Sequence, residues 1–477
     1  MKTIKKLTMA AIVIMVFCLS SCQPTNIVQI SVNKNLPNSF SSIQTTIADS
    51  IIPWKQYFTD PYLLALIDSA IANNQELNIT LKELDIMQNE VRAKKGEYLP
   101  FIGLQGGYGL EKPARYTSKG ANDANTEIYP GLETPEPLSD YAVGFTASWE
   151  LDIWKKLRNA KKSALTKYLA SVEGRRFMQT QLVAEIAISY YELLALDNEL
   201  EIINQNIAIQ KDALEIVKMQ KQAARASELA VKRFEAQLLN THGLRYSIEQ
   251  EIVETENKIN FLLGRFPSMV PRASEEFLSI TPKPTGVINP AQLLLERPDL
   301  RRAELNLESA KLDVKVARAR FYPSFGINAG VGFQAFDVKY FLRSPESLLY
   351  NIASDIAAPL VNRNQIKAWY KNANAKQFQA VLEYEQSILN AFIEVQNQIS
   401  KINNIEKSYS LKLKEVDALT QSTSISSKLF SSARADYMEV LLTQRDALES
   451  KFDLIEIKKD QLKAYVSMYK TLGGGWK

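Results

Sequence analysis

Hydrophobic and polar residues alternate along residues 141–151, and the pattern then changes to the spacing of a helix. The alternation places apolar side chains on one face and small or polar side chains on the other, which is typical of a β-strand. From Trp154 onward, apolar residues recur at steps of three and four and so share one helix face. No proline occurs between Pro137 and Pro267. We therefore predict a strand leading directly into a helix over 154–224, roughly 105 Å long.

The same succession of elements occurs twice along the chain. In each half, a helical pattern leads to a strand that follows Pro100 or Pro323, then to a second strand, a long proline-free helix and a returning helix. Each returning helix ends before a glycine, Gly264 or Gly473, and these two glycines are 209 residues apart. The two prolines are 223 residues apart, which indicates a longer hairpin loop in the first half. The chain is therefore predicted to be one duplicated unit, mainly α-helical with four strands.

The N-terminus has the pattern of a targeting segment. Three lysines among the first six residues precede an apolar run over 7–19, and Cys22 follows. The run is too short to span a bilayer comfortably, which favours a cleaved signal. It resembles a bacterial lipoprotein signal, which implies cleavage before Cys22 and lipid attachment there; the alternative is an ordinary secretory signal that contains a cysteine. Gln23 resembles the residue found at this position in proteins sent to the outer membrane.

These patterns set the expected domain limits. Residues 1–21 are the signal peptide, and residues 22–53, which are rich in polar residues without a sustained period, are a tether or an outer wrap. The first repeat covers 54–266 and the second covers 289–477. The segment between them, 267–288, contains four prolines and is interpreted as a linker.

Composition and single residues argue against several kinds of chemistry. The net charge of +4 is small for 477 residues, so nucleic acid is a poor candidate partner. Both cysteines, Cys18 and Cys22, lie in the targeting segment, which excludes disulfides and thiolate chemistry in the mature chain. The one histidine, His242, has no neighbouring ligand cluster. We expect no catalytic site, no metal site and no cofactor, and hence no enzyme.

The four strands suggest a membrane role that a single copy cannot fulfil. No stretch after the signal has 18 consecutive apolar residues, so membrane crossing would have to use strands. Each strand has about ten to thirteen residues, close to the span of a tilted transmembrane strand. Four strands leave open edges that lipid cannot satisfy, so two or three copies would have to combine. A soluble four-stranded sheet with an antiparallel coiled coil is the alternative.

Four motifs, in chain order, resemble those of TolC-type outer-membrane factors, most nearly the NodT- and OprM-like lipoproteins of resistance-nodulation-division efflux systems. They are Trp-Glu-Leu-Asp-Ile-Trp at 149–154, Arg-Pro-Asp-Leu-Arg-Arg-Ala-Glu at 297–304, Ala-Arg-Phe-Tyr-Pro-Ser at 319–324 and Leu-Gly-Gly-Gly-Trp at 472–476. The resemblance runs from about Trp54 to the end of the chain.

The resemblance implies the complete fold and the partners. Three copies would form a twelve-stranded β-barrel in the outer membrane, continued by a periplasmic tunnel of twelve helices. The implied partners are a periplasmic adaptor and an inner-membrane resistance-nodulation-division pump, with outer-membrane lipid around the barrel. The tunnel would be a passive conduit for small molecules such as drugs, closed at its periplasmic tip until the adaptor docks.

The two helix-to-helix turns would form that tip. The family pattern there is roughly Gly-x-x-Ser-x-Leu-Asp-Val, and the corresponding segments are 224–231 and 433–440. Ala224 and Ala433 replace the usual glycines, and Ala230 replaces the usual acid. These departures bear on how the adaptor docks.

Charged residues in the two turns are candidates for a gate. The candidates are Arg225, Glu228, Arg434 and Asp436. We predict that they form ion pairs or hydrogen bonds that keep the tip closed. The alternative is that they are solvated turn charges, each of which contributes little.

Two other functions remain open on the sequence. A conduit for protein secretion has the same tunnel pattern. A coiled-coil scaffold tethered to the membrane through Cys22 would have the same lipid anchor but no channel.

Overall fold

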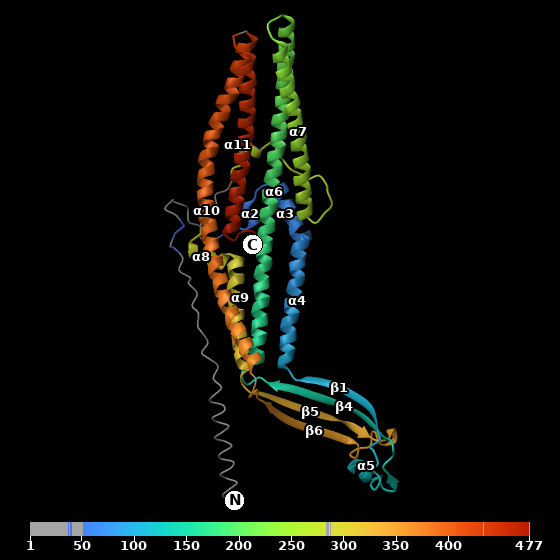
Figure 1. Ribbon diagram of the computed structural model, residues 1–477. Helices are drawn as coiled ribbons and strands as arrows, with labels where there is room; N and C mark the ends of the chain where they lie inside the picture. Colours follow the sequence, from blue (N-terminus) through green and yellow to red (C-terminus); the bar gives the residue numbers. More distant parts are fainter. Residues whose placement is uncertain are drawn as a thin grey trace. The chain divides into compact units, whose positions relative to one another are not determined.

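The computed structural model describes residues 37, 39–40, 51–282, 286, 288–361, 363–432 and 434–476 (Figure 1). These residues divide into two compact units. The first unit contains Asp85–Leu169 and Leu305–Leu382. The second contains the described residues of Val32–Leu84, Ala170–Glu304 and Glu383–Lys477. Each unit therefore draws on both halves of the duplicated sequence.

The first unit holds a four-stranded antiparallel sheet with the strand order β1-β4-β5-β6 (Figure 1). Its strands are β1 (Phe101–Glu111), β4 (Leu138–Leu151), β5 (Ser324–Ala335) and β6 (Leu348–Ala357). All four predicted strands are confirmed. Strand β4 pairs with β5, so the hairpins from the two halves form one sheet.

The longer loop predicted for the first half is also present. It contains helix α5 (Ser118–Asp123) and the short strands β2 (Glu127–Tyr129) and β3 (Leu132–Glu133), which pair with each other. The shorter loop of the second half contains the 3₁₀-helix η2 (Val338–Tyr340). Tyr129 of the first loop stacks on Tyr340 of the second, with ring centroids 5.4 Å apart.

The helices follow the same order in each half of the chain. The first series is α4 (Gln75–Tyr98), α6 (Lys156–Gln222) and α7 (Glu228–Leu262), and the second is α9 (Pro298–Ala319), α10 (Asn364–Ser431) and α11 (Tyr437–Thr471). Shorter elements precede each series: α2 (Trp54–Tyr57), α3 (Pro61–Asn73), η1 (Phe277–Ser279) and α8 (Pro290–Glu296). Within the described residues, no helix has both the length and the apolar character needed to cross a membrane.

The first long helix begins two residues later than the sequence predicts. Lys155 has a φ of 59°, which a helix cannot contain, and α6 begins at Lys156. The Asp152 carboxylate accepts hydrogen bonds from the backbone N–H groups of Leu157 and Arg158, each at 2.9 Å. These bonds satisfy two donors that the first helical turn leaves unpaired, and so they define the start of the helix.

The returning helices end as predicted, at left-handed glycines. Gly264 and Gly473 have φ values of 66° and 96°. A Cβ atom at Gly264 would lie 2.6 Å from the Asn73 carbonyl oxygen, and one at Gly473 would lie 2.7 Å from the Glu296 carbonyl oxygen. Because each glycine meets the end of a preceding short helix, α3 or α8, the same close contact occurs in both halves.

The core of the second unit is rich in aromatic residues. Tyr57 stacks on Tyr469 with ring centroids 4.2 Å apart, and the Tyr469 hydroxyl donates to the Ile52 carbonyl oxygen at 2.7 Å. Tyr190 is fully buried and donates to the Asp60 carboxylate at 2.7 Å. Phe40 also belongs to this unit and stacks on Phe392 at 5.1 Å. Segments distant in the sequence are thus held together by buried rings.

Candidate channel wall and helix turns

The sheet of the first unit has one polar face. Residues on this face include Gln105, Thr146, Ser148, Asn328, Gln334, Asn351 and Asp355. Asn328 donates to the Asp355 carboxylate at 3.0 Å, and Gln334 donates to the Asp140 carboxylate at 2.9 Å. These amide–carboxylate bonds connect neighbouring strands through polar side chains. A face of this kind is suited to contact with water.

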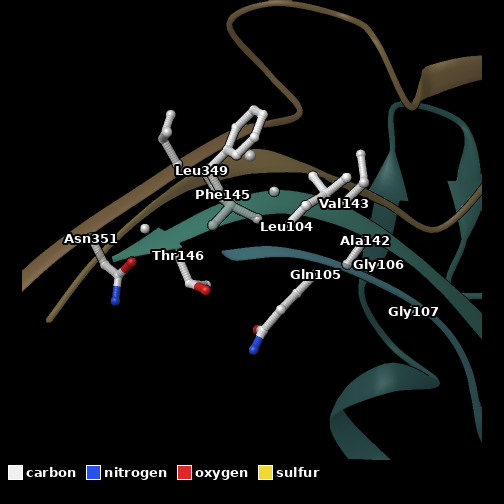
Figure 2. A pocket seen from close by; sticks show the side chains of 14 residues that line it. Leu104, Gln105, Gly106, Gly107, Ala142, Val143, Phe145, Thr146, Leu349 and Asn351 are labelled. Atoms are coloured by element: carbon white, nitrogen blue, oxygen red, sulfur yellow. The ribbon is translucent and has the colours of Figure 1, made fainter. Parts of the chain in front are cut away.

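A hollow of about 590 Å³ lies on the sheet. Figure 2 shows Gln105, Thr146 and Asn351 pointing to one side of the strands, while Val143 and Phe145 point to the other. Gly144 and Gly332 lie opposite each other on β4 and β5 and contribute no side chain to the polar side. Successive side chains therefore point to opposite faces of the sheet on all four strands, as the period-two pattern of the sequence predicts.

The opposite face of the sheet is apolar and exposed. One row across the four strands consists of Leu104, Phe145, Val331 and Tyr350. Tyr350 is 80% exposed, and its neighbour on the same face, Ile352, is 79% exposed. Soluble monomers rarely expose a continuous apolar surface of this kind, so this face requires a nonaqueous neighbour.

Two tryptophans of the Trp-Glu-Leu-Asp-Ile-Trp motif connect the sheet to the adjoining helices within the first unit. The Trp149 indole N–H donates to the Tyr98 carbonyl oxygen at 3.1 Å. The Trp154 indole N–H donates to the Pro323 carbonyl oxygen at 2.7 Å, and its ring stacks on Tyr322 at 4.7 Å. The motif therefore positions the ends of strands β4 and β5 by hydrogen bonding and stacking.

The Arg-Pro-Asp motif is structural. Arg297 is buried and forms ion pairs with Asp299 at 2.7 Å and with Glu394 of α10 at 2.8 Å. It also donates to the Thr471 carbonyl oxygen at the end of α11 at 3.0 Å. One guanidinium thus joins three helices of the second unit, and its charge is compensated.

The turn between α6 and α7 has a defined backbone geometry. Ala224 has a φ of 54°, and the Arg225 N–H donates to the Gln220 carbonyl oxygen at 2.8 Å, as at the glycine-ended helices. The Ser227 hydroxyl accepts from the Ala230 N–H at 3.2 Å and caps α7. Glu228 is exposed and pairs with Lys221 across the turn, and this hydrogen bond lowers the pKa of Glu228.

The predicted gate residues all lie at the turns and are exposed. The Arg434 N–H donates to the Leu429 carbonyl oxygen at 2.8 Å, and Asp436 precedes α11 without capping it through its side chain. Within the described residues of this one chain, Arg225, Arg434 and Asp436 form no ion pair. The role of these residues in keeping the tip closed stays a prediction.

An apolar contact near the turns was missed by sequence reasoning. Phe234 of α7 is buried beside Val231 and Val440, and Phe430 and Tyr437 pack against this cluster. The rings of Phe234 and Phe430 are 6.5 Å apart. The spacing of apolar residues on α7 indicated an apolar face but carried no information on its partner, which is about 200 residues away.

The lipid attachment site, Cys22, lies outside the described residues. Among the residues that the structure describes, no three His, Cys, Asp or Glu side chains are grouped as metal ligands would be.

Comparison with known proteins decides the family. Residues 66–265 and 289–474 match the family described as outer membrane efflux protein. The chain belongs to the outer membrane efflux protein family. As a member, it is the outer-membrane channel component of an efflux pump, it lies in the outer membrane, and it is not an enzyme. The resemblance stated from the sequence motifs is confirmed.

Individual relatives agree with this assignment over nearly the whole chain. The solvent efflux pump outer membrane protein SrpC of Pseudomonas putida is 28% identical over 436 residues, which cover 91% of this chain and 89% of SrpC. The pyoverdine export outer membrane protein OpmQ of Pseudomonas aeruginosa is 25% identical over 429 residues, which cover 90% and 88%. The fold matches that of the Neisseria gonorrhoeae MtrE outer membrane channel with a TM-score of 0.82 at 22% identity, covering 95% and 99%.

Proposed function

We propose that three copies of this outer membrane efflux protein assemble into one conduit, with the polar sheet faces lining it and the apolar faces in lipid. The observation that carries the proposal is the two-faced sheet, polar along Gln105, Thr146 and Asn351 and apolar along Leu104, Phe145 and Tyr350. Water on one face and hydrocarbon on the other satisfy both sets of side chains.

The edges of the sheet support assembly. Within the described residues, β1 pairs only with β4, and β6 pairs only with β5, so one edge of each outer strand has no partner. An unpaired strand edge in hydrocarbon leaves several N–H and C=O groups without hydrogen bonds. Pairing of β1 with β6 of another copy removes this cost. Three copies then give twelve strands, within the range of outer-membrane barrels, and the long helices continue as a tunnel.

Family membership supports a proposal for the cargo and the partners. Relatives are described by their names as handling solvents, toluene or pyoverdine. We assign small molecules as the cargo of this chain. A periplasmic adaptor docks at the exposed turns 223–227 and 434–436, and an inner-membrane resistance-nodulation-division pump supplies the energy.

The N-terminal assignments complete the proposal. The signal over 1–21 is removed and Cys22 carries the lipid. The repeats over 54–266 and 289–477 each supply two strands and two long helices, joined by the linker 267–288. Mass spectrometry of the mature N-terminal peptide tests the lipid: an unmodified Cys22 would reject the anchor but leave the conduit unaffected.

The central experiment measures conductance. Purified full-length protein reconstituted into planar lipid bilayers should give discrete, repeatable current steps in potassium chloride. A Cys22→Ala variant with a cleavable signal should still require detergent and migrate as a heat-resistant trimer. A detergent-free, monodisperse monomer without channel activity would overturn the proposal and favour a tethered scaffold.

A further inference from the structure

A basic groove runs along α6, α9 and α10 in the first unit. It has a volume of about 700 Å³, and its lining includes Lys167, Asp313, Arg320, Trp369 and Lys376. All five residues belong to the first unit. Figure 1 shows α9 running beside α10 in this part of the chain. We refer to this cavity as the basic groove.

Shared residues connect the basic groove to the polar face of the sheet. A second groove, of about 720 Å³, contains Lys167, Asp313 and Arg320 of the basic groove together with Glu97 and Glu150. A third groove, of about 550 Å³, also contains Glu97 and Glu150 and extends over the polar-face residues Ser148, Asn328 and Asp355. The three grooves are therefore linked through shared lining residues, and the third reaches the polar face at Ser148, Asn328 and Asp355 and the opposite face at Trp149 and Phe325.

Charge is balanced in the second groove. Lys94 pairs with Glu97 at 2.7 Å, and Lys156 pairs with Glu150 at 2.5 Å. Lys167 pairs with Asp313 at 2.9 Å. Each of these cations has a carboxylate partner, so an incoming anion gains little there.

Charge is not balanced in the basic groove. Arg320 and Lys376 are exposed and, in the described part of the chain, form no ion pair. The Arg320 guanidinium lies over the Trp369 ring, 4.3 Å from its centroid, and Trp369 is 41% exposed. Arg320 thus lies against an accessible aromatic surface, and a second cation without an ion pair among the described residues, Lys376, lines the same groove. A guanidinium held on a ring keeps its N–H donors available for a carboxylate or a sulfonate.

We propose that the basic groove is a subsite of the conduit that takes planar organic anions. The anionic group pairs with Arg320 and Lys376, and the planar ring packs against Trp369 and the guanidinium plane. The proposal rests on the assembly proposed above, because that assembly places this surface on the water-filled path. Each copy contributes the same two cations, so passage of organic anions is favoured at the junction between the strands and the helices.

The test uses naphthalenedisulfonate as a planar anionic probe in planar bilayers containing the full-length protein. We expect the probe to reduce the potassium chloride current in the unmodified channel. An Arg320→Ala, Lys376→Ala double variant should need a probe concentration at least about fivefold higher for the same reduction, and Trp369→Ala about two- to fivefold higher. All three side chains are exposed, so the variants should fold, which their current in potassium chloride alone verifies.

A matched control removes the same charge elsewhere. The exposed lysines Lys162 on α6 and Lys371 on α10 line none of the three grooves. A Lys162→Ala, Lys371→Ala variant should respond to the probe as the unmodified channel does. The subsite would be overturned, with the conduit intact, by equal probe sensitivity in all variants. A control variant that lost as much probe sensitivity as the Arg320→Ala, Lys376→Ala variant would overturn it equally. Protein that forms no channel at all would overturn both proposals.

Discussion

Gly144 and Gly332 lie directly opposite each other on β4 and β5, and neither position has room for a side chain. A Cβ atom at Gly332 would lie 2.4 Å from the Val143 carbonyl oxygen and 2.6 Å from the Gly144 Cα atom. These are backbone atoms in the middle of a paired strand, so they cannot move aside without breaking the ladder between β4 and β5. The close pairing of β4 with β5 at this point therefore depends on this glycine pair.

Replacing Gly332 with alanine should destabilise the sheet. We expect Gly332→Ala to lower the free energy of unfolding by about 1–3 kcal/mol, the usual range for overpacking, and to reduce the yield of heat-resistant oligomer on gels. Gly107→Ala is the control, because a Cβ atom there meets nothing within 4 Å. Equal yields for the two variants would contradict the steric argument.

The turn between α6 and α7 should become more stable with a glycine at its left-handed residue. Ala224 has a φ of 54°, where a Cβ atom costs roughly 1–2 kcal/mol. Ala224→Gly should therefore slow amide hydrogen exchange at residues 220–231, measured by mass spectrometry. Ala223→Gly is the matched control, because φ there is not positive and glycine only adds flexibility. Faster exchange in Ala224→Gly would show that the turn is not strained.

Stability should depend on the protonation of Glu199. This residue is 9% exposed on α6, and burial together with the neighbouring Glu456 carboxylate raises the pKa of Glu199 to about 7. Lys459 of α11 partly opposes this rise, and Glu251 of α7 adds to it. The raised pKa favours the protonated form of Glu199 in the folded state. The contribution of this group to the free energy of unfolding is therefore fully present below its ordinary pKa of 4.5 and is lost as pH rises through about 7.

The measurement is thermal unfolding in detergent over a pH series. The free energy of unfolding should fall by about 1–3 kcal/mol between pH 4 and pH 8, and Glu199→Gln should remove most of this dependence. Glu201→Gln changes an exposed carboxylate on the same helix and should retain it. If the Glu199→Gln profile matched that of the unmodified protein, the pH dependence would have another source.

The predicted gate can be tested by conductance. An Arg434→Ala, Asp436→Ala variant should raise the single-channel conductance, because contacts that hold the turns together would be removed. The control is Lys232→Ala with Glu235→Ala, an exposed ion pair of 2.8 Å on α7 beyond the turn. Unchanged conductance in the turn variant would reject the gate and leave these residues as solvated turn charges.

The sequence alone determined the faces of the strands, the duplication and the helix ends. Alternation along 141–151 reports which side chains share a face, because side-chain direction in a strand follows from position alone. Gly264 and Gly473 marked the helix ends because a left-handed residue favours glycine. The family motifs at 149–154 and 472–476 carried the functional assignment. All these signals are local in the chain.

Only the tertiary structure decided which distant residues meet. It brought Phe234 to Phe430, buried Arg297 among Asp299, Glu394 and Thr471, and placed Arg320 over Trp369 in the basic groove. Periodicity reveals which face of a helix is apolar but not which helix covers it, since many pairings bury similar area. Which pairing forms depends on the shape and charge of side chains from segments that are far apart in the sequence.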